Sequence, residues 1–79
     1  MTAEDTIALA EARVRAGNGD LAAIRQRARL SQDAIGRAVG VSRVAVCRWE
    51  SGQRAPSGDA AVRLAKLLRD LEGIGGGGR

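Results

Sequence analysis

The chain is short of the residues that usually carry catalysis and disulfide bonds. Its 79 residues include no histidine and only one cysteine. With no histidine, no cysteine cluster and no evident pair of carboxylates, the sequence offers no metal site, no cofactor site and no catalytic base. We therefore expect no enzymatic activity. The lone Cys47 excludes an intramolecular disulfide and fits a reducing cytosol.

Other absences exclude further classes of function. There is no phenylalanine or tyrosine and only one tryptophan, which argues against single-strand nucleic-acid binding by aromatic stacking. No apolar run is long enough to cross a membrane, and no signal-peptide core is present. We therefore expect a cytoplasmic protein that does not contact membranes. The closing GIGGGGR follows no predicted strand and opens no helix, so it is not a nucleotide-binding fingerprint.

Arginine is what the chain has in excess. Twelve arginines stand against one lysine, the formal net charge is +4, and alanine and glycine are abundant. This bias is typical of GC-rich coding and points to a bacterium or its phage. The charge is uneven: residues 21–54 carry seven arginines against two carboxylates, a balance of +5, whereas residues 1–20 carry −2 and residues 55–79 carry +1. Such a concentration of positive charge is typical of a surface that binds a polyanion.

Hydrophobic spacing predicts an all-α chain with no internal repeat. The expected helices span residues 3–16, 21–28, 32–39, 43–51 and 58–71. In the first of them, Ile7, Ala10 and Val14 recur at helical spacing. At this length the helices form one small domain, a compact bundle of about five short helices.

The most informative stretch is LSQDAIGRAVGVSRVAVCRWESGQRAP, residues 30–56. Ser31 and Ser42 are N-cap residues in front of two short helical segments. Gly40 ends the first segment as a left-handed residue can. The order of cap, helix, glycine, apolar residue, cap and helix is that of a helix-turn-helix. Apolar residues of both helices share one buried side: Ile35, Val39, Val41, Val46 and Trp49.

The opposite side of the second helix carries Arg43, Val44, Cys47 and Arg48. These positions form one exposed face because they are one, four and five residues apart. An arginine can bond both acceptors of a guanine in the major groove, and an aliphatic side chain can touch the methyl group of thymine. The face therefore has the chemistry of a reader of duplex DNA.

Three separated motifs carry a family resemblance: LSQ at 30–32, GVS at 40–42 and RWESGQRAP at 48–56. With them the chain resembles the Cro/phage-repressor (XRE-type) helix-turn-helix family over about residues 21–71. The resemblance implies a lambda repressor-like DNA-binding fold. Two departures stand out. Gly36 replaces the usual alanine, which should loosen its helix slightly, and the usual fifth helix has no obvious counterpart.

The helix positions and the resemblance together suggest roles for individual residues. We expect base contacts from Arg43, Val44, Cys47 and Arg48. We expect phosphate contacts from Gln32, Ser42, Gln53 and Arg54. The resemblance also implies a structural ion pair between Arg25 and Glu50. By this division, residues 1–19 are an N-terminal helical extension, residues 20–72 the DNA-binding domain and residues 73–79 a flexible glycine-rich tail.

The function that these features favour is sequence-specific binding of a double-stranded DNA operator by a transcriptional regulator, a small Cro-like repressor. An antitoxin-type autorepressor and a protein-interaction module without DNA binding stay open as alternatives. We expect a homodimer at least on DNA, because one recognition helix reads only a few base pairs. The stripe of Ile7, Leu9 and Val14 could form the dimer interface or simply complete the core. No cofactor and no small-molecule effector are evident.

Overall fold

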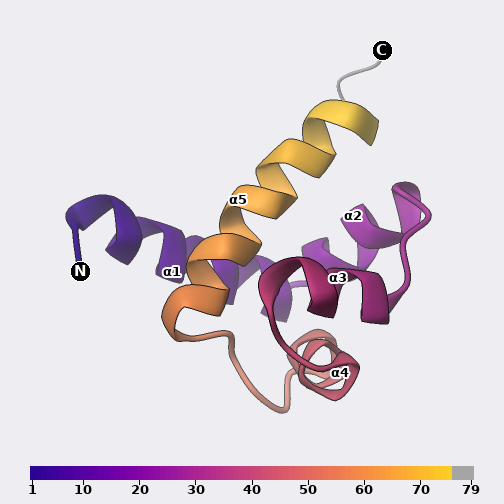
Figure 1. Cartoon of the computed structure of the whole chain (residues 1–79), viewed down its shortest axis with the longest axis horizontal. Helices are drawn as coiled ribbons and strands as arrows, with labels where there is room; N and C mark the ends of the chain where they lie inside the picture. Colours follow the sequence, from indigo (N-terminus) through magenta and orange to yellow (C-terminus); the bar gives the residue numbers. More distant parts are fainter. Residues whose placement is uncertain (76–79) are drawn as a thin grey trace.

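The computed structural model describes residues 1–75, and all of its regular structure there is helical (Figure 1). The helices are α1 (Ala3–Gly17), α2 (Asp20–Arg27), α3 (Gln32–Val39), α4 (Arg43–Ser51) and α5 (Gly58–Gly75). The predicted all-α class and the number of helices are confirmed, and the bounds of α3 and α4 agree with the prediction at both ends. In Figure 1, α4 is seen nearly end-on beside α3, while α1 and α5 cross on the other side of the bundle.

The helix-turn-helix begins and ends where its caps require. The hydroxyl of Ser31 accepts the Ala34 N–H at 3.0 Å, and that of Ser42 accepts the Ala45 N–H at 3.1 Å. Each bond satisfies an amide that the helix leaves unpaired. Gly40, which closes α3, has a φ of 83°, a left-handed conformation that glycine adopts at little cost.

The core lies where the helices meet. Its larger members come from every helix except α1: Leu21, Ile24, Ile35, Val39, Val46, Trp49, Leu64 and Leu68. Trp49 is 4% exposed, which confirms its expected place in the core. Val41 packs against this cluster while partly exposed. The apolar side predicted for the helix-turn-helix is therefore the side that faces the core.

The buried face of α1 consists of alanines, while Leu9, one of the larger apolar residues, packs partly buried against the core. Ala8, Ala12 and Ala16 are buried, and α1 makes its most extensive contacts with α5. Alanine lets two helix backbones approach closely, so the smaller residues face the neighbour. Ile7 and Val14 stay 63% and 62% exposed, so this part of the stripe does not complete the core.

Gly36 is packed more tightly than the sequence suggests. It is buried in α3, and a Cβ at this position would lie 2.6 Å from the backbone oxygen of Val41. The expected loosening of α3 is therefore not the main effect of this glycine. Its missing side chain lets the turn and the start of α4 pack directly against α3.

The last helix runs past its predicted end at Leu71 as far as Gly75. Leu71 is buried, and Arg15 of α1 bonds the Glu72 carboxylate at 2.9 Å. These contacts anchor α5 as far as Glu72, in the turn before its end. Residues 73–75, expected as the start of a flexible tail, are thus helical, and residues 76–79 lie outside the described part of the chain.

Candidate nucleic-acid interface

One side of α4 faces the core and the other faces solvent. Val46 and Trp49 are buried, whereas all four residues assigned to base contacts are exposed: Arg43, Val44, Cys47 and Arg48. Val44 is an exposed aliphatic side chain, 46% accessible, between the two arginines. The structure therefore places these four side chains on one solvent-facing surface, as their spacing predicts.

Several arginines in the described part of the chain lack acidic partners. Within residues 1–75, five arginines make no ion pair and no side-chain hydrogen bond: Arg27, Arg29, Arg43, Arg48 and Arg54. A guanidinium without a carboxylate partner keeps its N–H donors available to a phosphate or a base edge. Three of the five, Arg43, Arg48 and Arg54, lie on α4 or in the loop after it, and their charge is open to an external anion.

The residues assigned to phosphate contacts differ in how many hydrogen bonds their side chains already make within the protein. Gln53 and Arg54 are exposed in the loop after α4, and their backbone amides both donate to the Arg48 carbonyl. The hydroxyl of Ser42 already caps α4. Gln32 Nε2 donates to Glu50 Oε1 at 3.0 Å. Its second amide hydrogen is the one left for a phosphate.

The ion pair that the resemblance implies is present. Arg25 Nε and Nη2 lie 2.7 and 3.0 Å from the two carboxylate oxygens of Glu50, so the contact is bidentate. The side chains are 14% and 10% exposed. Burial acts to raise the pKa of Glu50, but hydrogen bonds from Arg25 and Gln32 outweigh it, so this pKa lies below its ordinary value.

The pair is part of a larger junction that the sequence did not reveal. Arg25 also donates to the Leu30 carbonyl at 3.0 Å, and Gln32 shares the Glu50 carboxylate. Glu50 thus ties α2, the loop after it and the start of α3 to the end of α4. Gln32 was assigned only to phosphate, because its position at a helix start gives no sign of a partner eighteen residues away. The junction fixes the orientation in which α4 presents its exposed face.

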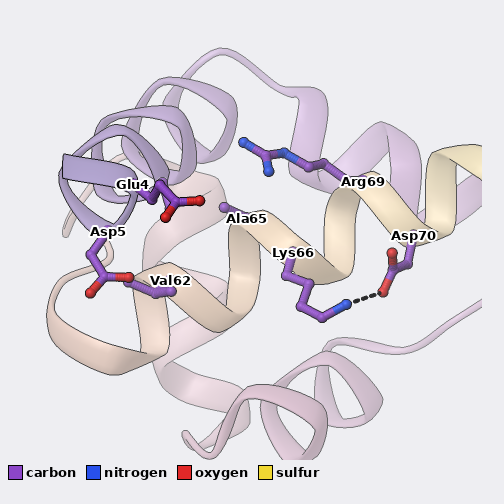
Figure 2. Close-up of a pocket in the computed structure, with 8 residues that line it drawn as sticks. Glu4, Asp5, Val62, Ala65, Lys66, Arg69 and Asp70 are labelled. Atoms are coloured by element: carbon purple, nitrogen blue, oxygen red, sulfur yellow. Dashed lines mark hydrogen bonds and ion pairs between the residues drawn. The ribbon is translucent and has the colours of Figure 1, made fainter. Parts of the chain in front are cut away.

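A cleft of about 370 Å³ lies on a different part of the surface, between α1 and α5. Figure 2 shows Glu4 and Asp5 on one side of it, and Lys66, Arg69 and Asp70 on the other. Lys66 donates to Asp70 at 3.3 Å. With charges of both signs, this cleft is not suited to a polyanion. Among residues 1–75, no group of three metal-binding side chains comes together.

Comparison with known proteins agrees with this geometry. The sequence profile of the helix-turn-helix family matches residues 21–72, well over half of the chain. The chain belongs to this family, in its Cro/phage-repressor branch. The matched part of this helix-turn-helix chain contains α2, α3 and α4 and most of α5, whereas α1 precedes it.

A named relative of this helix-turn-helix chain is repressor protein C2 of Salmonella phage P22. The two sequences are 38% identical over 45 residues, which are 57% of this chain and 21% of the relative. The chain thus spans about a fifth of the length of the relative it matches. No solved structure matched the chain. In the described part, no helix has the length and apolar character needed to span a membrane.

Proposed function

We propose that this helix-turn-helix chain is a sequence-specific double-stranded DNA-binding regulator of transcription, a small Cro-like repressor that inserts α4 into the major groove. The carrying observation is the exposed face of α4, where Arg43 and Arg48 have no carboxylate partner among residues 1–75. The similarity to a protein named a repressor supports the choice. The chain acts by binding rather than catalysis, in the cytoplasm where operator DNA lies.

The base-reading residues are the four on the exposed face of α4. Arg43 lies in the first turn, the end that enters the groove in helix-turn-helix proteins. Arg43 and Arg48 pair with guanine, and Val44 touches a thymine methyl. Cys47 is small enough to let the helix approach the bases. Each arginine–guanine contact contributes about 1–3 kcal/mol of discrimination against a wrong base.

Contacts to the phosphates of the DNA backbone position α4 in the groove without selecting a base sequence. They come from Gln32 and Ser42 at the starts of α3 and α4, where helix N-termini favour anions. Gln53 and Arg54 add contacts from the loop after α4. These residues all lie within the unit of residues 20–72. The unit is held rigid by the junction at Glu50, so phosphate contacts at its edges fix the register of α4 in the groove.

The active species on DNA is a homodimer, because two half-sites about one helical turn apart need two recognition helices. The surface that α1 leaves open supports a role in pairing. Ile7 and Val14 are more than 60% exposed, and they flank the exposed Ala10. A mass measurement of the protein–DNA complex should find two protein copies per duplex for the parent. It should find one copy when Ile7 and Val14 are both replaced by serine. A dimer that survives these changes places the interface elsewhere.

The function is tested by binding to duplex DNA over a range of salt concentrations. If four to six phosphates are neutralised per monomer, the logarithm of affinity should fall with the logarithm of salt at a slope of about −4 to −5. Selection from randomised duplexes should then yield one preferred sequence. A flat salt response contradicts DNA binding and favours a protein-interaction module.

A further inference from the structure

A second, smaller cleft lies beside the loop that follows α4. It has a volume of about 90 Å³, and Arg13 and Gly17 line it from α1 while Arg54 and Pro56 line it from the loop. None of its lining residues carries a carboxylate. Two arginines therefore line one cleft whose lining residues supply no negative charge, and such a pair of like charges favours an anion.

Arg13 differs from its neighbour Arg15 in how it is held. Arg15 is committed to Glu72 and Asp20. Arg13 makes one bond, from Nε to the carbonyl of the buried Pro56 at 3.0 Å. A guanidinium has five N–H donors, so the four on its terminal nitrogens keep no partner among residues 1–75. The bond to Pro56 thus holds the Arg13 guanidinium, with its free N–H donors, beside the loop that follows the recognition helix.

We infer that Arg13, together with Arg54, binds a phosphate of the DNA backbone, so that α1 extends the DNA-binding surface beyond the helix-turn-helix unit. The inference rests on the proposed function. Planar guanidinium forks suit phosphate oxygens, and the cleft is continuous with the loop already assigned to backbone contacts. Arg13 lies outside residues 21–72, the part matched by the family, so its contribution belongs to the segment that precedes the motif.

The test compares two substitutions that remove the same charge and the same kind of bond. Arg13→Gln removes the proposed phosphate contact. Arg63→Gln is the matched control, because Arg63 also lacks a carboxylate partner within residues 1–75 and donates to a backbone carbonyl, that of Val39 at 3.2 Å. Arg63 does not line the small cleft. Circular dichroism melts check that both variants stay folded before binding is measured.

The salt dependence of duplex binding is the deciding readout. One lost phosphate contact makes the slope of log affinity against log salt shallower by about 0.9. Arg13→Gln should show this change on preferred and unrelated duplexes alike, and Arg63→Gln should keep the parent slope. Equal slopes for the two variants would overturn the inference while leaving the proposed function intact. If the parent itself fails to bind duplex DNA, the proposed function and the inference on Arg13 are both wrong.

A second measurement identifies the phosphate on the DNA side. Duplexes that each carry one uncharged methylphosphonate are bound to the parent and to Arg13→Gln. The parent should lose affinity at a flanking phosphate where the variant loses severalfold less. If both proteins respond alike at every position, Arg13 contacts no phosphate and serves only to hold Pro56.

Discussion

The basic side chains on the two sides of this molecule differ in what they are bonded to. On α1 and α5, within the described residues, Arg15, Lys66 and Arg69 make ion pairs with carboxylates, whereas Arg13 and Arg63 bond backbone carbonyls. Between these helices, in residues 20–57, five of the seven arginines have no acidic partner within the described chain. We call the paired set of Arg15, Lys66 and Arg69 the α1–α5 surface, and the unpaired set of Arg43, Arg48 and Arg54, on α4 and in the loop after it, the α4 surface. Both sets are basic, but the side chains of the second set have no carboxylate to leave before they meet an external anion.

The comparison shows why a net charge is an incomplete guide to a binding surface. An arginine that already bonds a carboxylate must give up that bond before it can neutralise a phosphate. The bond is weak when it is exposed, worth under about 1 kcal/mol, yet every such pair also brings a negative charge that repels DNA. The α4 surface avoids both costs, and the one carboxylate on α4, Glu50, is turned inward toward Arg25.

Glu50 offers the largest effect and tests whether the α4 surface depends on its inward pair. Glu50→Gln leaves Arg25 charged, 14% exposed and without a counter-ion. Losing one partner of such a pair should lower the free energy of unfolding by about 3–5 kcal/mol. Denaturant unfolding measures it. The control is Asp33→Asn, which breaks the exposed pair with Arg37 and should cost under about 1 kcal/mol. Equal losses in the two variants would show that the Glu50 pair is not special.

Gly36 tests whether the close contact between α3 and α4 sets the position of the recognition helix. Gly36→Val introduces atoms where a Cβ alone would be 2.6 Å from the Val41 oxygen. Overpacking of this kind should cost about 1–3 kcal/mol of stability. Gly73→Val is the control, because nothing lies within 4 Å of a Cβ there. A stable Gly36→Val variant with unchanged DNA binding would contradict the tight junction.

The arginines of the α4 surface should fall into two classes. Arg43→Ala and Arg48→Ala should each relax preference at one or two operator positions, by about 1–3 kcal/mol of discrimination. Arg54→Ala should weaken all sequences alike and make the salt slope shallower by about one unit. Selection of randomised duplexes against each variant separates the classes. A uniform loss with Arg43→Ala and Arg48→Ala, with sequence preference intact, would show that they do not read bases.

Acid should weaken the inward pair of Glu50 and Arg25 and so lower the stability of the fold. Glu50 has a lowered pKa in the folded protein, so the unfolded chain binds its proton more readily. The stability it provides is present above the ordinary glutamate pKa of about 4.3 and is lost as pH falls through the lower folded value. Midpoints of denaturant unfolding measured from pH 7 to pH 3 should fall less steeply for Glu50→Gln than for the parent. Parallel curves would remove Glu50 from the acid response.

The sequence predicted the parts of this molecule whose signals are local. Ser31, Gly40 and Ser42 act within one helical turn, so the bounds of α3 and α4 followed from them. The Arg25–Glu50 pair came from the family resemblance, since no local rule joins residues 25 positions apart. Two hydrogen bonds depend on tertiary packing, the one from Gln32 to Glu50 and the one from Arg13 to the Pro56 carbonyl. Neither can be predicted from the spacing of residues in the sequence.

The face of α1 shows what the spacing of apolar residues leaves open. Ile7 and Val14 are the larger apolar residues, yet Ala8, Ala12 and Ala16 face the core. A hydrophobic stripe indicates which face is apolar, but the distance between helix backbones decides which apolar residues fit. Gly36 shows the same limit. Its role is to let the Val41 backbone pack against α3, which depends on tertiary contact and not on helix propensity.

The central claim is that unpaired arginines of the α4 surface bind DNA and paired ones of the α1–α5 surface do not. The most direct measurement is the salt slope of duplex binding for two double variants of equal charge loss, Arg48→Gln with Arg54→Gln and Lys66→Gln with Arg69→Gln. Against a parent slope of about −4 to −5, we expect a slope shallower by about one unit for the first, from the phosphate contact of Arg54, together with relaxed sequence preference from the loss of Arg48, and no change for the second. Equal changes in both, or a flat parent slope, would contradict it.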